Sequence, residues 1–340
     1  MKLFVPRETA DGETRVAATP ETVKQMVSAD IGVQVQAGAG EGANFSNEAF
    51  GEAGAQLVSE SEAKAAWGEA DVVLRVSPPT VDEAKSMREG ALFVGFVAPH
   101  KNLDAVRALR DGGVTALAME LVPRITRAQS MDALSSQASI AGYKAVLIAA
   151  ERLDKYFPLL MTAAGTLKPA RVVIMGAGVA GLQAIATAKR LGAVVEVSDI
   201  RPEVKEQIES LGGKFIELPM QESGAGEGGY AKEMSADFLK KQREIVAQHV
   251  AQADVVITTA LVPGRPAPKL VSPDMVHSMR PGSVIVDLAV AQGGNCELSK
   301  PDEEVIENGV RIVGAGNLPA AMPRDASLVY ARNLWAMLKP

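Results

Sequence analysis

The residues best suited to chemistry are the glycines of the motif Gly176-Ala-Gly178-Val-Ala-Gly181, which follows the apolar run Arg171–Met175 and opens a helical pattern over Val179–Leu191. In a strand–turn–helix unit, the first glycine allows a tight turn, the second lets the backbone approach a pyrophosphate, and the third lets helix and strand pack closely. The unpaired N–H groups of the helix N-terminus then face the phosphates. The spacing predicts a dinucleotide-binding loop; the alternative is a purely structural glycine turn. The predicted contacts of this loop are Gly176, Gly178, Val179, Ala180 and Gly181.

An acidic residue, Asp199, follows the next predicted strand, Val194–Val197, at about the 20-residue distance that is typical of such loops. A carboxylate there accepts hydrogen bonds from both hydroxyls of the adenosine ribose and repels a 2′-phosphate. Asp199 therefore favours NAD over NADP. Arg201 could partly offset this preference, but an exposed arginine at the start of a helix is a simpler interpretation.

Two other segments are rich in glycine. Residues 38–43 also match the loose pattern, but Glu41 would lie against the phosphates and the next helix is delayed, so we expect no nucleotide there. Gln221–Tyr230 lies between a predicted strand and a predicted helix, beside the expected nucleotide crevice. We interpret it as a mobile lid closed by Tyr230 and Met234; the alternative is a tolerated surface insertion.

The densest polar stretch of the chain covers residues 123–135 and follows the predicted strand Val114–Met119. It lies at the carboxyl end of a parallel strand, where ligands bind in open α/β sheets. We expect it to face a cleft between two domains. Arg124 and Asp132 could pair there, and Gln129 could hold a carboxamide. The alternative is an N-capping surface loop that opens the following helix.

Short apolar runs alternate with helical patterns along most of the chain, which is typical of parallel, doubly wound α/β sheets. The predicted strands of the first set are Leu3–Pro6, Val33–Ala37, a short strand near Leu57, Val72–Val76, Ala91–Val97 and Val114–Met119. Those of the second set are Arg171–Met175, Val194–Val197, Lys214–Leu218, Val255–Thr259, Ser283–Leu288 and Val310–Val313. We expect two Rossmann-like domains separated by a cleft. Residues 1–130 plus 317–340 form the first, and the dinucleotide-binding domain covers 131–316.

The helices that connect these strands have recognisable starts. Thr19 before Pro20 and Ser61 before Glu62 are typical of N-cap positions. Pro158 and a turn over Gly165–Pro169 break the pattern after a long helix. The predicted helices are Pro20–Ile31, Asn47–Gly54, Glu62–Trp67, Val81–Arg88, Leu103–Arg110, Met131–Leu153, Val179–Leu191, Glu203–Leu211, Ala236–Ala251, Pro273–Met279 and Ala326–Leu338.

The composition excludes several classes of protein. The 340-residue chain carries a formal net charge of −6, which argues against a nucleic-acid surface. The single cysteine, Cys296, rules out an intramolecular disulfide framework, and three histidines leave little room for a metal site, so we expect no metal. The longest apolar run, Ala91–Pro99, is about half of a membrane span, and the N-terminus lacks a signal-peptide pattern. We expect a soluble, reduced, cytoplasmic chain that does not span the membrane.

The chain becomes recognisable from an ordered series of segments: PRITRAQSMDALSSQ, MTAAGT, MGAGVAGLQAIATAKRLGA, SLGGKFIEL, GGYAKEMS, TTALVPG and GSVIVDLAVAQGGN. From RVAATPE near the N-terminus to the last helix, it resembles the NAD(H)-binding component, domain I, of proton-translocating NAD(P) transhydrogenases. The loop with Arg124, Gln129 and Asp132 and the segment GGYAKEM are the family-specific parts. Members of the family usually continue some tens of residues beyond this last helix, so docking contacts from such a tail stay undefined.

The resemblance implies a component that binds NAD(H) and passes a hydride from NADH to NADP⁺ held by a partner, coupled to proton translocation by a membrane subunit. Its partners would be a second copy of the chain, an NADP(H)-binding component and membrane-spanning subunits, at the cytoplasmic face of the inner membrane. By the family motif, the residues that orient the nicotinamide and its ribose are Arg124, Gln129, Asp132 and Ser135. Nucleotide contacts would be Val179, Asp199, Arg201, Gly229, Ala260 and Leu261, with Tyr230 and Met234 in the mobile loop.

The chain also resembles alanine dehydrogenase, the main alternative function, which moves a proton as well as a hydride and must hold an amino acid carboxylate. By that resemblance Arg15 is kept, but the lysine position carries Arg75 and the strand end beginning at Gly95 has no histidine. Ala291 stands where an aspartate would precede QGG. Hydride transfer between two nicotinamides releases no proton, so it needs no general acid or base. These departures favour the transhydrogenase component; a non-enzymatic NAD-binding module is a further alternative.

Overall fold

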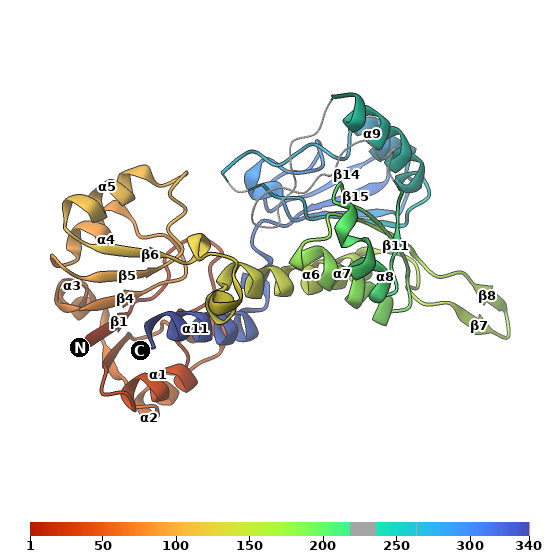
Figure 1. The fold of residues 1–340 in the computed structure, drawn as a ribbon. Coiled ribbons are helices and arrows are strands. Elements are labelled where there is room, and N and C mark those ends of the chain that lie inside the picture. The colour runs from red at the N-terminus through yellow and green to blue at the C-terminus, as the bar shows by residue number, and fades with distance from the viewer. Residues whose placement is uncertain (218–235, 263, 340) are drawn as a thin grey trace. The chain divides into compact units, whose positions relative to one another are not determined.

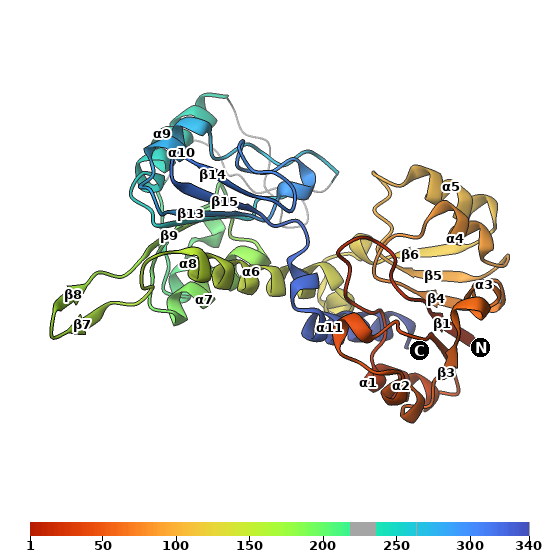
Figure 2. The same ribbon diagram turned by 180° about the vertical axis from the view of Figure 1, so that it is seen from behind.

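A computed structural model describes residues 1–217, 236–262 and 264–339 of the chain. Its contacts divide the chain into two compact units, drawn from opposite sides in Figure 1 and Figure 2. Unit 1 comprises Met1–Gln137 and Pro319–Pro340, and unit 2 comprises Ala138–Leu318. The sequence predicts 1–130 plus 317–340 and 131–316, whereas the observed boundary lies inside helix α6 (Ala133–Arg152).

In the described residues, the sheet of unit 1 consists of six strands, all paired in parallel, in the order β3-β2-β1-β4-β5-β6. They are β1 (Lys2–Val5), β2 (Gly32–Gln36), β3 (Gln56–Val58), β4 (Val72–Leu74), β5 (Leu92–Gly95) and β6 (Thr115–Ala118). The helices are α1 (Pro20–Val27), α2 (Asn47–Glu52), α3 (Glu60–Glu69), α4 (Val81–Ser86), α5 (Leu103–Asp111) and α11 (Pro323–Leu338), with the 3₁₀ helices η1 (Glu41–Ala43), η2 (Met119–Leu121), η3 (Thr126–Met131) and η7 (Leu318–Ala321). The strand order reverses between β1 and β4, so the predicted doubly wound α/β arrangement is confirmed for this unit.

Capping residues explain where two of these helices begin. Thr19 caps α1 as predicted, because its side chain accepts a hydrogen bond from the backbone N–H of Thr22 at 3.4 Å. The predicted start of α3 at Ser61 and Glu62 is wrong. Ser59 is the N-cap, and the Glu62 carboxylate accepts from its backbone N–H at 3.0 Å, which forms a capping box.

Helix α11, near the C-terminal end of the chain, completes the core of unit 1. Tyr330 and Leu334 are fully buried in the same cluster as residues of β1, β2 and β4. The Tyr330 hydroxyl donates to the backbone carbonyl of Arg75 at 2.8 Å, and Asn333 Nδ2 donates to the carbonyl of Ser130 at 2.8 Å. The last helix therefore fills space that the earlier segments of unit 1 leave open.

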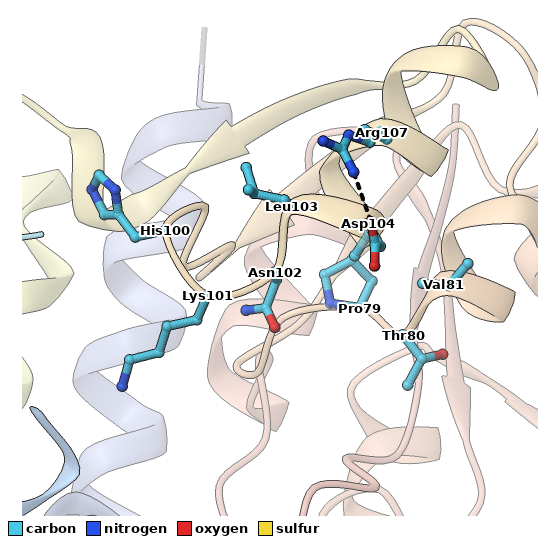
Figure 3. A pocket seen from close by; sticks show the side chains of 10 residues that line it. Pro79, Thr80, Val81, His100, Lys101, Asn102, Leu103, Asp104 and Arg107 are labelled. Carbon is cyan, nitrogen blue, oxygen red and sulfur yellow. Dashed lines mark hydrogen bonds and ion pairs between the residues drawn. The ribbon is translucent and has the colours of Figure 1, made fainter.

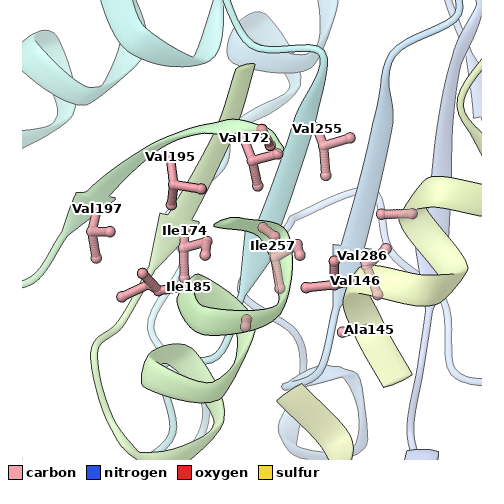
Figure 4. Close-up of a cluster of buried hydrophobic side chains, with 14 of the residues drawn as sticks. Ala145, Val146, Val172, Ile174, Ile185, Val195, Val197, Val255, Ile257 and Val286 are labelled. Atoms are coloured by element: carbon pink, nitrogen blue, oxygen red, sulfur yellow. The ribbon is translucent and has the colours of Figure 1, made fainter. Parts of the chain in front are cut away.

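Among the described residues of unit 2, the main sheet has seven strands in the order β11-β10-β9-β12-β13-β15-β14. They are β9 (Arg171–Met175), β10 (Val194–Ser198), β11 (Lys214–Phe215), β12 (Val255–Thr258), β13 (Val284–Asp287), β14 (Glu304–Glu307) and β15 (Val310–Gly314). The helices, besides most of α6, are α7 (Val179–Arg190), α8 (Lys205–Ser210), α9 (Ala236–Val250) and α10 (Pro273–Ser278), with η4 (Pro202–Val204) and η6 (Val290–Gln292). Figure 4 shows the buried core, where Ile174 and Ile257 of the strands pack with Ile185 of α7 and Val146 of α6.

Two antiparallel pairings depart from the predicted parallel pattern. Strand β14 pairs antiparallel with β15 across the turn Asn308-Gly309, whose residues have φ of 48° and 76°. The second is a hairpin of β7 (Leu160–Thr162) and β8 (Gly165–Leu167), in a segment where the sequence predicts only a break between elements. Both views show this hairpin projecting from the main sheet of unit 2, and Met161 on it is 81% exposed.

Within the ranges that the structure describes, every helix is too short or too polar to cross a lipid bilayer.

Candidate functional site

The glycine motif forms a tight turn between β9 and α7, and two of its three glycines have no room for a side chain. Gly176 has a φ of 102°, and a Cβ there would lie 2.7 Å from Thr259 Oγ1. A Cβ on Gly181 would lie 1.9 Å from the carbonyl oxygen of Gly176. Only glycine therefore allows both the turn and the close approach of α7 to β9, which are the mechanical roles that the spacing predicts.

The middle glycine, Gly178, faces open space instead. It is exposed, has a φ of −76°, and no described atom beyond its own neighbours lies within 4 Å of a Cβ built on it. Gly178 is the N-cap of α7, so the first N–H groups of the helix, at Val179 and Ala180, have no acceptor inside the helix. This end of α7 is therefore suited to an anionic group that approaches the backbone at Gly178.

A fourth glycine, which lies outside the motif and was not predicted to matter, supports the same turn. Gly142 of α6 faces α7, and a Cβ there would lie 2.0 Å from the carbonyl oxygen of Ala180. Nearby, Ser139 Oγ donates to Gln183 Oε1 at 3.4 Å. Helix α6 thus packs directly on the first turn of α7. The signal in the sequence is a glycine inside a long helical pattern, where this residue is unfavourable unless packing requires it.

The carboxylate of Asp199 is buried beside the glycine turn. Its Oδ2 accepts from the backbone N–H of Ala177 at 2.7 Å, so the acid also holds the turn itself. Arg201 forms a bidentate pair with this carboxylate, with Nε 2.9 Å from Oδ1 and Nη2 2.8 Å from Oδ2. This hydrogen bonding raises the pKa of Arg201. Arg201 is therefore not simply an exposed residue at a helix start, and any ribose hydroxyl at Asp199 would share the carboxylate with it.

The chain after β12 forms the other side of the turn. Thr259 Oγ1 donates to the carbonyl oxygen of Gly176 at 3.1 Å. The next residue, Ala260, is half-buried with its backbone bonded to the side chain of Asn295, and Leu261 is 38% exposed. Three predicted contacts and the expected lid lie outside the described residues: Gly229, Tyr230 and Met234, with the segment 221–230.

The predicted polar constellation lies on η3 and the start of α6. Arg124 and Gln129 are exposed. Asp132 accepts hydrogen bonds from the backbone N–H and the Oγ of Ser135, at 2.9 and 2.6 Å. The structure therefore brings Asp132 and Ser135 together at the N-terminal end of α6, which is the capping arrangement that the sequence left open as an alternative.

Two buried arginines of unit 1 are held by carboxylates of the same unit. Arg75 Nε lies 3.3 Å from Glu8 Oε2, and the same guanidinium pairs with Glu83. Arg15 Nη2 lies 2.6 Å from Glu13 Oε2. Burial raises the pKa of Glu8, because desolvation outweighs the attraction of Arg75. A carboxylate ligand would have to share these guanidiniums with carboxylates that are already bonded to them.

The glycines of residues 38–43 serve packing. A Cβ on Gly40 would lie 2.5 Å from the ring of Phe50 and 2.6 Å from the carbonyl oxygen of Phe45. Glu41 begins η1. Glycine is therefore needed at position 40 because two aromatic residues pack on it.

Unit 1 also contains a pocket of about 410 Å³ between the N-terminal ends of α4 and α5 (Figure 3). Thr80, His100 and Asn102 line it, and Asp104 and Arg107 on its rim form an ion pair at 3.0 Å. Its lining includes none of the residues predicted to bind a nucleotide.

Two family models match the chain. The alanine dehydrogenase/PNT N-terminal domain matches residues 4–141, and the alanine dehydrogenase/PNT C-terminal domain matches residues 145–340.

Curated and solved proteins resemble the chain over almost its whole length. An NAD(P) transhydrogenase subunit alpha chain of Rhodospirillum rubrum is 50% identical, and the match covers 100% of this chain and 90% of that one. A solved transhydrogenase structure from Sinorhizobium meliloti has a TM-score of 0.90 at 47% identity, and the match covers 100% of this chain and 92% of that one. Alanine dehydrogenase of Bacillus subtilis is 32% identical, over 96% of this chain and 82% of its own.

Proposed function

The chain belongs to the alanine dehydrogenase/PNT family of oxidoreductases, and from this premise we propose that it is the NAD(H)-binding component of a proton-translocating NAD(P) transhydrogenase. In this role it binds NADH and passes the hydride directly to NADP⁺ held by a partner component. The observation that carries the proposal is the 50% identity to the Rhodospirillum rubrum subunit, against 32% to the alanine dehydrogenase.

Unit 2 offers the groups that a dinucleotide needs. The open face at Gly178 and the N-terminal end of α7 suit the pyrophosphate. Asp199 supplies acceptors, which the hydroxyls of the adenosine ribose need and the 2′-phosphate of NADP does not. We therefore assign NAD(H) to this chain and NADP(H) to the partner.

The proposed chemistry makes few demands on ionisable side chains. Bound NADH supplies the hydride, and transfer between two nicotinamide rings moves no proton. The chain must hold the ring in a defined orientation and exclude water. We assign the contacts with the nicotinamide and its ribose to Arg124 and Gln129, whose side chains are exposed. The hydrogen bonds between Asp132 and Ser135 fix the start of α6 next to them.

The proposed assembly contains two copies of this chain, the NADP(H)-binding component and membrane-spanning subunits, on the cytoplasmic face of the membrane. The hairpin of β7 and β8 supports the homodimer. A two-stranded hairpin alone is marginally stable in water, and this one exposes Leu159, Met161 and Leu167. Exposed apolar side chains on a projecting arm favour a protein contact, and a second copy makes a closed, self-complementary pair.

Reconstitution tests the proposal directly. The purified chain is mixed with an NADP(H)-binding component, NADPH and an NAD⁺ analogue whose reduced form absorbs at its own wavelength. We expect rapid hydride exchange only when both proteins are present. The chain alone should bind NADH but should not reduce NAD⁺ when L-alanine is added.

A variant separates binding from ring orientation in the same assay. Gln129→Ala should slow hydride exchange by about tenfold or more, because a misaligned ring loses near-attack geometry. Its NADH affinity should stay within about threefold, since the glycine turn and Asp199 supply most of the binding. L-alanine-dependent reduction by the chain alone would instead establish the dehydrogenase. NADH binding with no exchange under any pairing would point to a non-enzymatic module.

A further inference from the structure

The side chain of Asn295, in the segment between β13 and β14, makes contacts that the proposed function does not yet use. Asn295 is fully buried. Its Oδ1 accepts from the backbone N–H of Ala260 at 3.0 Å, and its Nδ2 donates to the carbonyl of the same residue at 2.9 Å. Nδ2 also donates to the carbonyl of Pro268 at 2.8 Å. The carboxamide thus pairs with the backbone of one residue as a neighbouring strand would, and joins it to a second loop.

The clamped residue is adjacent to the glycine turn. Ala260 follows Thr259, whose Oγ1 donates to the carbonyl of Gly176 and whose backbone N–H donates to Met175 at 2.9 Å. A Cβ on Gly176 would lie 3.3 Å from the backbone nitrogen of Ala260. The position of Ala260 therefore sets the wall against which the turn closes, and Asn295 sets the position of Ala260.

The strand order shows which half of a nucleotide this wall would meet. Asp199 follows β10, which lies on one side of β9, and Ala260 follows β12, which lies on the other side. A dinucleotide whose adenosine ribose is at Asp199 and whose pyrophosphate is at the glycine turn must continue towards the end of β12. The wall at Ala260 therefore lies on the side of the nicotinamide half.

We propose that Asn295 is a positioning residue of the nucleotide site, which fixes the backbone of Thr259–Leu261 as a rigid wall for the pyrophosphate and the nicotinamide half of NAD(H). The identity of this ligand rests on the proposed function. The clamp itself rests on the hydrogen bonds of Asn295. Because no polar group of its side chain reaches the surface, Asn295 acts through Ala260 rather than by touching the ligand.

Asn295→Asp tests the clamp, because a carboxylate cannot donate to the carbonyls of Ala260 and Pro268 and leaves both buried acceptors without their donor. The full chain is titrated with NADH, followed by its fluorescence, and with AMP, the adenosine half, followed by calorimetry. We expect the Kd of NADH to rise by about tenfold or more. The Kd of AMP should stay within about twofold, because Asp199 and the turn beside it remain. Asn295→Ser is the second variant if the first one does not fold.

Ser299→Ala is the matched control. Ser299 donates to Asp287 Oδ2 at 2.6 Å in the same buried region, but it does not contact Ala260. This variant should lower the melting temperature and leave both affinities unchanged. Equal weakening of NADH and AMP by the Asn295 variants, or no weakening of either, would overturn the clamp while leaving the proposed function intact. A wild-type chain that binds neither AMP nor NADH would instead remove the proposed function.

Discussion

At the scale of single residues, the turn after β9 uses glycine for two opposite reasons. At Gly181 the space is closed, because the carbonyl of Gly176 occupies the place of a side chain. At Gly178 the space is open on the described structure, and the missing side chain leaves room for something else. A fold needs the first glycine, whereas a ligand needs the second.

The two glycines should therefore respond differently to the same substitution. Gly178→Ala should lower the melting temperature by only a few degrees, as expected of an alanine N-cap that costs about 1 kcal/mol. It should nevertheless weaken NADH binding by about tenfold or more, because the new methyl group faces the pyrophosphate. Gly181→Ala should lose both stability and binding, since its Cβ meets backbone. Thermal unfolding and NADH titration measure the two effects, and unchanged NADH affinity in Gly178→Ala would contradict the assigned position of the pyrophosphate.

The sequence predicts residues of the site well where their roles are local. The three glycines and Asp199 belong to one strand–turn–helix–strand unit, so their spacing alone indicates a turn and a nearby carboxylate. Asn295 could not be found in this way, because it contacts a residue 35 positions earlier and a single asparagine has no periodic pattern. The bidentate contact of Arg201 with Asp199 also depends on side-chain geometry rather than on spacing.

At the scale of elements, the contact of α6 with α7 decides how well the turn is supported. Gly142 lets the two helices approach so closely that a Cβ would lie 2.0 Å from the carbonyl of Ala180. The first turn of α7, which carries the orphan N–H groups of the candidate site, is thereby held from behind by α6. Loss of this contact should weaken the site through the helix rather than through the ligand.

Helix glycines with and without a close neighbour give opposite predictions for one substitution. Gly142→Ala should destabilise the chain by about 1–3 kcal/mol, because overpacking exceeds the helix-propensity gain. Gly51→Ala in α2 is the matched control, since no described atom beyond its neighbours lies within 4 Å of its Cβ. It should be neutral or stabilising by up to about 1 kcal/mol. Denaturant unfolding measures both, and a stable Gly142→Ala variant would contradict the tight helix contact.

Elements are predictable where burial leaves a trace in the sequence. The inner strands of both sheets are apolar runs because helices cover both of their faces. Strand β14 has only a local signal, the Asn308-Gly309 turn between two short runs, which the alternation of strands and helices does not include. The hairpin of β7 and β8 has none, because its residues are mostly exposed on both faces and show no period. The N-cap Ser59 competes with Ser61, and only the capping box with Glu62 decides between them.

At the scale of the whole molecule, the proposed homodimer gives the hairpin a function that a single chain does not. Met161→Glu places a charge on its most exposed apolar side chain and should shift the chain from dimer to monomer. Leu103→Glu is the control, because Leu103 is also exposed but lies on α5 of unit 1. Sedimentation velocity measures the state of each. A dimer that tolerates Met161→Glu as well as the control would exclude the hairpin from the contact.

The origin of α11 at the far end of the chain has a consequence in time. Ribosomes release the N-terminal end first, at about 5–20 residues per second, so the roughly 200 residues between the last strand of unit 1 and α11 take about 10–40 s to appear. Through that interval the place of Tyr330 and Leu334 in the core of unit 1 is unfilled. Unit 2 is one continuous stretch and can fold before unit 1 is complete. The order of folding should therefore run against the order of synthesis, and the nascent first unit is the part that a chaperone would need to protect.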